Sequence, residues 1–241
     1  MNIRINKFFT QHGICSRRDA DQFIEQQRVT INGQVAKLGD HVDVHDVIAR
    51  DGVVVPWGNA FVYIKYHKPV GVTTTSEPQV RRNIIAEIGH PTRIFPIGRL
   101  DKDSSGLILL TNDGDIVNAI LRVENGHERE YIVTVDHEFD APFLEQMALG
   151  VAIPGAVTRP CLMQRLSSRQ FRITLTEGRN RQIRRMCAAL GHRVVTLQRV
   201  RIMHIGIRGL ASGQWADLSA AELDELRHAL GRTQIIGGPR P

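Results

Sequence analysis

The stretch GRLDKDSSGLILLTNDGD, Gly98–Asp115, places several acids and glycines between two apolar runs. RIFPIGRL before the acids and GLILL after them are typical of strands, so the acids fall where one strand ends and the next begins. Two interpretations compete for this turn. The D-x-D-x-S-G spacing that starts at Asp101 matches the first half of a calcium loop. Alternatively, the single carboxylate of Asp101 faces an active site.

The calcium interpretation fails at the far end of the loop. The twelfth position, where such loops carry a bidentate Glu, is Asn112, and Lys102 places a cation among the supposed ligands. The flanks are also strand-like rather than helical. Asp101 is therefore the candidate functional carboxylate, and Asp103 and Ser105 are interpreted as turn residues. The alternative for Asp101 is an ordinary turn residue that accepts backbone N–H groups.

The segments around this turn interleave strands and helices irregularly. Thr111 or Asn112 is expected to cap a helix through IVNAILR, with Asp113 and Asp115 near its start. Further strands are predicted in FVYIKYHK, EYIVTVD, FRITLTEG and VVTLQRVRIMHIGI, and further helices around residues 143–149, in RNRQIRRMCAALGH and in SAAELDELRHAL. This order predicts an α+β fold whose sheet is mixed and mainly antiparallel.

The first 55 residues are predicted to form a separate small module. A helical stripe that ends at Gly13 precedes the capping-box pattern Ser16-x-x-Asp19, which opens a second helix. Asn32-Gly33 between two short β-rich runs predicts a hairpin with a type I′ turn. PWGNA, residues 56–60, is expected to be a linker to a larger domain over residues 61–232, followed by a loose tail over 233–241.

The overall composition limits the class of protein. With 241 residues and 42% hydrophobic content the chain can form a real core, yet no apolar run reaches the roughly 18 residues of a membrane span. Its three cysteines form no CxxC pair, so neither a disulfide framework nor a metal site is encoded. MNIRINKFF lacks the apolar stretch of a signal peptide. We therefore expect a cytoplasmic protein without a membrane partner.

The basic residues are mostly arginines and are unevenly distributed. Residues 159–208 contain twelve Arg, no Lys and one acid, Glu177. A guanidinium matches a phosphate bidentately and stacks on bases, so this half of the chain is expected to hold RNA or DNA. Within EGRNRQIRRM the spacing of Arg181, Arg184 and Arg185 predicts one face of a helix. The alternative is a solvated basic surface.

Two resemblances refine these expectations. INKFFTQHGICSRRDADQFIEQQRVTINGQVAKLGDHVDVHD resembles the S4 RNA-binding module, which implies that Arg17, Arg18 and Lys37 face structured RNA. GRLDKDSSGLILLTNDGD, EREYIVTV and LTEGRNRQIRRMCAALGHRV together resemble the RNA pseudouridine synthases of the RsuA, RluB, RluE and RluF group. KPVG resembles the first block of that family, which usually has Asn where this chain has His67.

The second resemblance implies a catalytic domain with a central RNA-binding cleft and a set of roles. Asp101 would attack the target nucleotide, Tyr131 would stack on the flipped uracil and help to remove a proton, and Arg184 would form a salt bridge with Asp101. Arg99 would fill the space that the base leaves. RNA contacts are implied for Arg179, Asn180, Arg181 and Arg185. No metal or cofactor is implied, because the isomerisation gains and loses no group.

The target RNA is predicted less directly. ILRVENGHEREY resembles the large-subunit rRNA synthase of the F type, which implies a uridine of 23S rRNA and a monomeric enzyme. A tRNA stem-loop and small-subunit rRNA remain alternatives. Two rivals from other classes also remain: a noncatalytic RNA-binding or ribosome-assembly factor, and a calcium-regulated binding module. The noncatalytic factor would be expected to lack the Asp, Tyr or Arg of the catalytic set, and all three are present.

Overall fold

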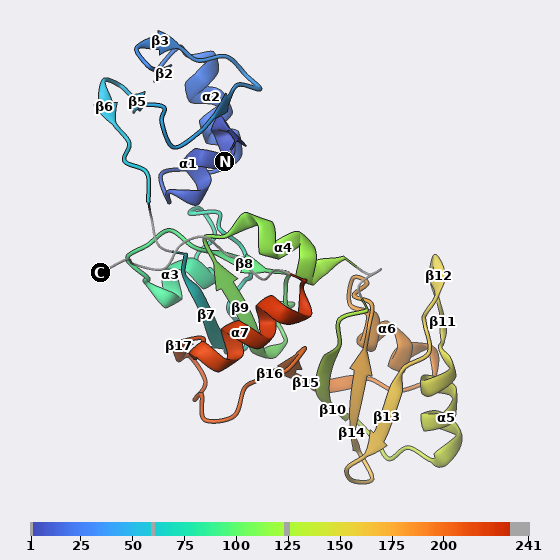
Figure 1. The fold of residues 1–241 in the computed structure, drawn as a ribbon. Coiled ribbons are helices and arrows are strands. Elements are labelled where there is room, and N and C mark those ends of the chain that lie inside the picture. Colours follow the sequence, from blue (N-terminus) through green and yellow to red (C-terminus); the bar gives the residue numbers. More distant parts are fainter. Residues whose placement is uncertain (1, 59–60, 123–125, 232–241) are drawn as a thin grey trace.

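The computed structural model describes residues 2–58, 61–122 and 126–231 (Figure 1). Residues 59 and 60 of the expected linker and the expected tail, 233–241, lie outside the described residues, as does part of the segment before Tyr131 on which the subtype prediction rests. No helix in the described ranges is long and apolar enough to cross a membrane.

The N-terminal part contains two helices and short strands around its own core. Within the described residues, a four-stranded sheet has the order β3-β2-β5-β6, and β1 pairs with β4. The elements are β1 (Ile3–Arg4), α1 (Ile5–Gln11), α2 (Arg17–Glu25), β2 (Val29–Ile31), β3 (Gln34–Val35), β4 (His41–Val42), β5 (Ile48–Arg50) and β6 (Val53–Val54).

Two local predictions for this part are confirmed. The Ser16 hydroxyl accepts a hydrogen bond from the Asp19 N–H while the Asp19 carboxylate accepts one from the Ser16 N–H, so both first-turn donors are satisfied. Asn32 and Gly33 have φ angles of 51° and 81°, as a type I′ hairpin requires. The core forms around Ile5, Phe8 and Phe9, all buried, because α1 turns its apolar stripe toward the sheet.

The larger part is built on one long sheet. Within the described residues it has nine strands, and its main path is β13-β14-β10-β15-β9-β7-β17. The strands are β7 (Tyr63–Lys68), β8 (Phe95–Ile97), β9 (Ser105–Thr111), β10 (Arg129–Val135), β13 (Leu162–Arg165), β14 (Gln170–Leu175), β15 (Val194–Ile202), β16 (Ile205–Gly206) and β17 (Trp215–Asp217). A separate hairpin consists of β11 (Ala152–Ile153) and β12 (Ala156–Val157).

The pairing of β9 with β15 is parallel, whereas the other strand pairs of the described sheet are antiparallel. The expected α+β fold with a mixed, mainly antiparallel sheet is therefore confirmed. The parallel pair joins two halves of the sheet, with β7 and β8 on the side of β9 and with β10, β13 and β14 on the side of β15 (Figure 1).

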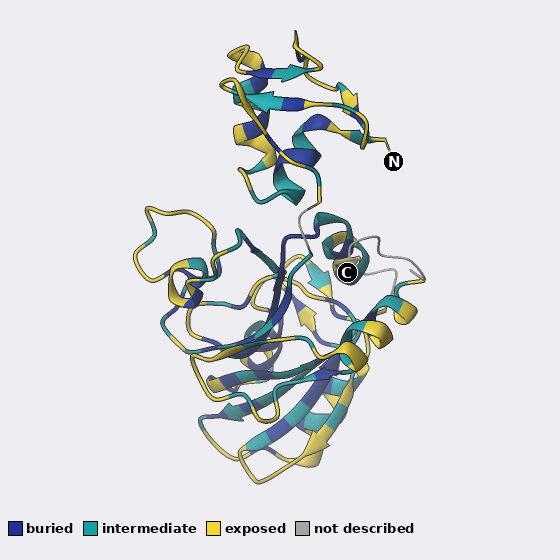
Figure 2. Cartoon of the chain, turned by 60° about the vertical axis from the view of Figure 1, so that its left-hand side comes forward, coloured by how far each residue is buried: buried dark blue, intermediate teal, exposed yellow. Residues whose placement is uncertain are grey.

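Helices cover both faces of this sheet. They are α3 (Ile84–Ile88), α4 (Gly114–Leu121), α5 (Ala141–Leu149), α6 (Gln182–Ala189) and α7 (Ala220–Ala229). Along β9, Leu107 and Leu109 pack in a cluster with α4 and α7, while Ile108 and Leu110 pack in a cluster with α3. A strand buried on both faces needs apolar residues at every position, which explains the unbroken run GLILL (Figure 2).

The predicted cap of one helix is wrong by one or two residues. The cap of α4 is Asp113, whose carboxylate accepts the Asp115 N–H, rather than Thr111 or Asn112. Those two residues are buried at the end of β9, so their side chains are committed to the sheet and its neighbours. Helix α5 starts at Ala141 because the Asp140 carboxylate caps the N–H of Phe143.

Candidate active site

Asp101 lies in the turn between β8 and β9, where the chain reverses within a few residues. Gly98 adopts a φ of 77° as the chain leaves β8, and the Ser104 N–H donates to the Asp101 carbonyl at 3.1 Å. The carboxyl side chain of Asp101 is 30% exposed. Its place in the turn after a strand, partly open to solvent, allows it to meet a substrate.

The segment after β7 holds this turn from behind. The Gly71 N–H donates to the carbonyl of Lys102 at 2.7 Å, and the Thr74 hydroxyl donates to the carbonyl of Leu100 at 2.8 Å. Lys68 is fully buried beneath them, and its ammonium donates to the carbonyls of Pro69 and Val72. Burial lowers the pKa of Lys68 to about 8, although the charges of the nearby Asp103 and Asp101 oppose the change.

The structure does not contain the expected ion pair between Arg184 and Asp101. Arg181 is the residue whose guanidinium lies 3.5 Å from the Asp101 carboxylate, and it also forms two hydrogen bonds with Asp103. Arg184 instead donates to the carbonyls of Asp103, at 2.9 Å, and Val194, at 3.2 Å. Arg184 lies inside α6 and points beneath the turn, whereas Arg181 precedes the helix and reaches over the carboxylates.

Arg181 is also not on a helix face as predicted. It is the N-cap of α6 with φ 49° and ψ 34°, a left-handed conformation that costs a non-glycine residue roughly 1–2 kcal/mol. The ion pairs with the two aspartates hold it there. The hydrogen bond from Arg181 also keeps the pKa of Asp103 below its ordinary value. Asp103 is therefore more than the turn residue that the sequence suggested: it fixes both arginines.

Tyr131 lies on β10, opposite Arg199 of β15 and Ile173 of β14. The register of β10 against β15 shifts between Glu130 and Tyr131 because β15 carries an extra residue, Val200, whereas β10 pairs regularly with β14. The ring is half-buried and packs against the cores on both sides of the sheet junction. It thus presents one part of its surface to the space in front of Asp101.

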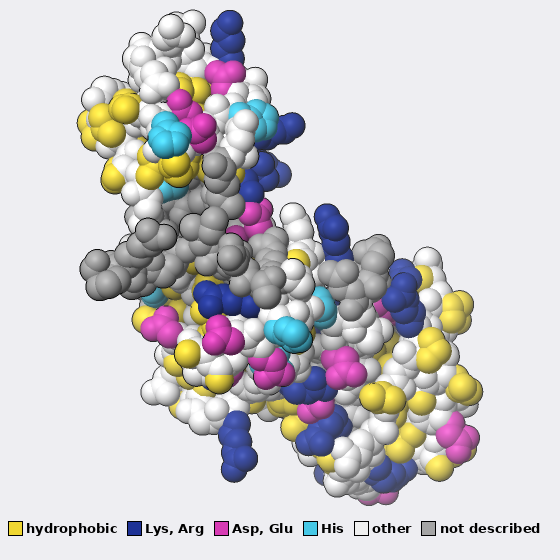
Figure 3. All heavy atoms as spheres, in the orientation of Figure 1, with side chains coloured by type: hydrophobic (Ala, Val, Ile, Leu, Met, Phe, Trp, Pro, Cys, Tyr) yellow, Lys and Arg dark blue, Asp and Glu magenta, His cyan; other side chains and the backbone are white. Residues whose placement is uncertain are grey.

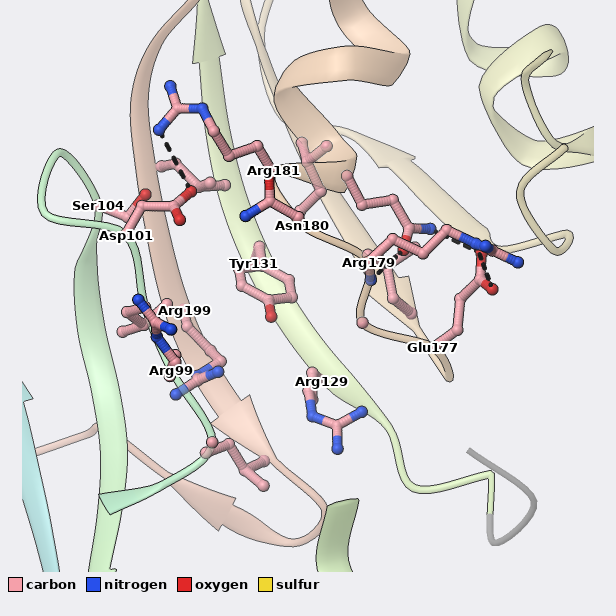
Figure 4. Close-up of a pocket in the computed structure, with 18 of the residues that line it drawn as sticks. Arg99, Asp101, Ser104, Arg129, Tyr131, Glu177, Arg179, Asn180, Arg181 and Arg199 are labelled. Carbon is pink, nitrogen blue, oxygen red and sulfur yellow. Dashed lines mark hydrogen bonds and ion pairs between the residues drawn. The ribbon is translucent and has the colours of Figure 1, made fainter. Parts of the chain in front are cut away.

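These elements enclose a pocket of about 430 Å³, a size typical of sites for small ligands. Figure 4 shows Tyr131 in the middle of the pocket, with Asp101 and Arg181 at one end and Arg129 at the other. The lining brings together segments that are far apart in the sequence. It includes Arg99, Asp101, Ser104, Arg129, Tyr131, Glu177, Arg179, Asn180, Arg181 and Arg199.

Of the other expected site residues, most lie at this pocket. Arg99, exposed, lines both this pocket and a second one beside β8. Arg179 and Asn180 line it on the loop before α6, where Arg179 pairs with the buried Glu177 at 3.2 Å. Arg185 does not line it. Its guanidinium turns toward the β11–β12 hairpin, where it bonds the carbonyl of Pro154.

Arg17, Arg18 and Lys37 are exposed on the N-terminal part and lie apart from the pocket. Figure 3 shows basic side chains along one edge of that part and a second group over the region of β10, β14 and β15. The basic side chains suit a polyanion such as RNA. On the larger part, acidic side chains lie between the basic ones.

The sequence pattern did not single out two buried arginines of the pocket. Arg129, two residues before Tyr131 on the same face of β10, donates to the carbonyls of Ile120 and His127, and burial lowers its pKa. Arg199 is only 3% exposed. The sequence pattern that could have indicated these arginines is a charged residue inside a predicted strand, because cations are seldom fully buried unless they are paired.

Two other histidine-containing sites lie outside the pocket lining. His67, where the family usually has Asn, contacts the carbonyl of Leu210 and the side chain of Gln198. Elsewhere, possible metal-ligand atoms of Asp136, His137 and His192 lie within 4.8 Å of one another, a grouping that the sequence reading did not foresee. The imidazole rings of His137 and His192 are stacked, with their centroids 4.1 Å apart.

Residues 62–189 match the family described as RNA pseudouridylate synthase, and residues 3–48 match the S4 domain. The chain belongs to the RNA pseudouridine synthase family. This synthase is 48% identical over 227 residues to the dual-specificity RNA pseudouridine synthase RluF of Escherichia coli (strain K12), a match that spans 93% of this chain and 78% of that protein. The predicted family and enzyme class are thereby confirmed.

Two further similarities support the same assignment. The synthase is 34% identical over 233 residues to the ribosomal large subunit pseudouridine synthase B of Bacillus subtilis (strain 168), which covers 93% of this chain and 95% of that protein. A crystal structure of a pseudouridylate synthase superposes with a TM-score of 0.68 at 29% identity, covering 93% of this chain and 99% of that one.

Proposed function

We propose that this synthase isomerises specific uridines of large-subunit (23S) ribosomal RNA, with Asp101 as the nucleophile toward a uridine flipped out of its stack. The observation that carries the proposal is the pocket in which Asp101 and Tyr131 face a common space lined by arginines. An aromatic ring can stack on an extruded base, and the arginines offset part of the few kcal/mol that unstacking costs.

The reaction breaks the bond between C1′ and N1 of the uridine and forms one between C1′ and C5. C5 loses a proton and N1 gains one, so the nucleotide keeps its composition and no co-reactant enters the balance. In this proposal Tyr131 supports the base and helps to remove the C5 proton. Arg181 aims the Asp101 carboxylate, and Arg184 positions the turn through the main chain of Asp103.

The remaining roles are proposed from position and charge. Arg99 fills the space that the base leaves, and Arg179 and Asn180 hold the RNA backbone at the mouth of the pocket. Arg17, Arg18 and Lys37 bind structured RNA from an S4-like module over residues 1–55, joined by a linker over 56–60 to a catalytic domain over 61–232. Arg185 supports the hairpin beside α6. We propose a monomer that works in the cytoplasm.

The choice of RNA is supported by the named relatives. The relative from Bacillus subtilis is named for the large ribosomal subunit, and the one from Escherichia coli is named dual-specificity. We therefore propose 23S rRNA as the main target and a tRNA stem-loop as the second candidate. Mapping pseudouridine in rRNA and tRNA from cells that lack the protein identifies the target directly.

The test of the nucleophile compares two neighbouring carboxylates. Asp101→Asn should abolish pseudouridine formation while RNA affinity stays within a few-fold, because the amide keeps the size but not the charge. Asp103→Asn is the matched control, expected to slow the reaction by about tenfold through looser arginines. If Asp101→Asn kept its activity while Asp103→Asn lost it, the nucleophile would be Asp103, and the proposal for Asp101 would be overturned.

A further inference from the structure

Arg199 is a buried cation with an unused donor at the wall of the pocket. Arg199 is only 3% exposed, and its Nε donates a hydrogen bond to the carbonyl of Leu107 at 2.7 Å. Its Nη2 is buried and has no hydrogen-bond partner among the residues that the structure describes. Nor does any carboxylate of the described ranges form an ion pair with it.

The position of Arg199 is fixed by the backbone on both sides. Its Cα partner on β10 is Tyr131, and its Cα partner on β9 is Gly106. Directly opposed residues of antiparallel strands direct their side chains to the same face, so the guanidinium and the Tyr131 ring share the pocket side of the sheet. The geometry thus places a rigid donor beside the ring on which the base is proposed to stack (Figure 4).

An isolated buried charge is costly, and proteins keep one where a ligand or a function compensates for it. The fold offers Arg199 only part of what a guanidinium needs, since it has five N–H donors and one described acceptor. A ligand that enters the pocket is the remaining source of acceptors.

We propose that Arg199 donates a hydrogen bond to a carbonyl oxygen of the uracil ring in the flipped nucleotide. This inference rests on the proposed function and deepens it. The pocket interior receives the base, because the sugar and phosphate stay linked to the RNA strand outside. The exposed Arg179 and Arg181 at the mouth are available for phosphates, whereas the buried Arg199 meets the tip of the nucleotide.

The experiment replaces Arg199 and the ring oxygens separately and then together. Arg199→Met keeps the length of the buried side chain and removes its N–H donors. The matched control is Arg193→Met, because Arg193 directly precedes β15 and its side chain is 79% exposed. The substrate is a synthetic stem-loop that carries the uridine found by mapping, made with uridine, 2-thiouridine or 4-thiouridine at that position. Single-turnover rates and RNA affinities are measured.

Arg199→Met should slow isomerisation by about 10- to 100-fold, the effect of losing a charge-assisted hydrogen bond, while RNA affinity and the melting temperature change little. One thio substitution should slow the wild-type enzyme and have no further effect in Arg199→Met, because both changes remove the same contact. Arg193→Met should match the wild type.

A purely structural role predicts a different pattern, in which the variant and each thio substitution slow the reaction by independent factors. That additive result for both thio positions overturns the inference, as does a wild-type rate in Arg199→Met. Should Arg199→Met fail to fold, Arg199→Leu, which also lacks N–H donors, gives the same comparison. Failure of the proposed function is distinct, since the wild-type enzyme would then isomerise no uridine in any of these RNAs.

Discussion

Replacing Gly106 by Ala tests the junction on which the site depends. Gly106 has a φ of 112°, and a Cβ there would lie 2.2 Å from the carbonyl oxygen and 2.5 Å from the nitrogen of Arg199. Both atoms belong to the backbone of β15, so no side chain can rotate away. The two strands would have to separate by about 1 Å to restore ordinary contact distances.

The cost follows from two terms. The unfavourable backbone conformation costs a residue with a Cβ roughly 1–3 kcal/mol. Separation of the strands weakens ladder hydrogen bonds around the two parallel pairs, Gln198 with Ser105 and Arg199 with Gly106, at about 1 kcal/mol for each bond lost. We expect Gly106→Ala to lower the free energy of unfolding by about 3 kcal/mol or more, which corresponds to a fall in melting temperature of about 6–12 °C.

Gly155→Ala provides the matched control. Gly155 also has a positive φ, 84°, but a Cβ there meets no atom within 4 Å. Gly155→Ala should therefore lower the free energy of unfolding only through the unfavourable backbone conformation, by about 1 kcal/mol. Both variants are unfolded with urea and by heat, and isomerisation is measured at a temperature where each is folded. Equal losses of stability in the two variants would refute the argument from close strand approach, and unchanged activity in folded Gly106→Ala would refute the link to the site.

Two further predictions concern groups beneath the catalytic turn. Arg184→Met removes the donors that hold the carbonyls of Asp103 and Val194, so the isomerisation rate should fall about 100-fold while RNA affinity stays nearly unchanged. The control Arg185→Met should lower the rate less than about tenfold, and equal losses of rate in single-turnover assays would contradict the positioning role of Arg184. Burial lowers the pKa of Lys68 from its ordinary value of 10.5 to about 8, so between these values the unfolded chain binds more protons and stability rises with pH. The free energy of unfolding of the wild type relative to Lys68→Met should therefore increase by about 1 kcal/mol per pH unit from pH 8 to 10 in urea titrations, and a flat difference would show that Lys68 is not perturbed by folding.

Short-range features were readable because they depend on neighbours in the chain. The Ser16–Asp19 capping box and the Asn32-Gly33 turn each follow from residues within four positions of one another. Asp101 was also identified from its local setting, after a predicted strand, once the calcium-loop interpretation had failed at Lys102 and Asn112. The three motifs that resemble the synthase family carried the function, which the comparisons confirm.

The sequence by itself determined most of the longer helices and strands, the family and the identities of Asp101 and Tyr131 as candidates, whereas β13, β17, α3 and the β11–β12 hairpin were not predicted. Only the tertiary structure decided which arginine reaches which carboxylate. Arg181 and Arg184 are three residues apart, and the left-handed backbone at Arg181 sends it to Asp101 while the helix sends Arg184 to the main chain of Asp103. The role of Arg199 was hidden for the same physical reason. Its surroundings come from β9, β10 and β15, and strand pairing across long separations is set by the packing of the whole sheet.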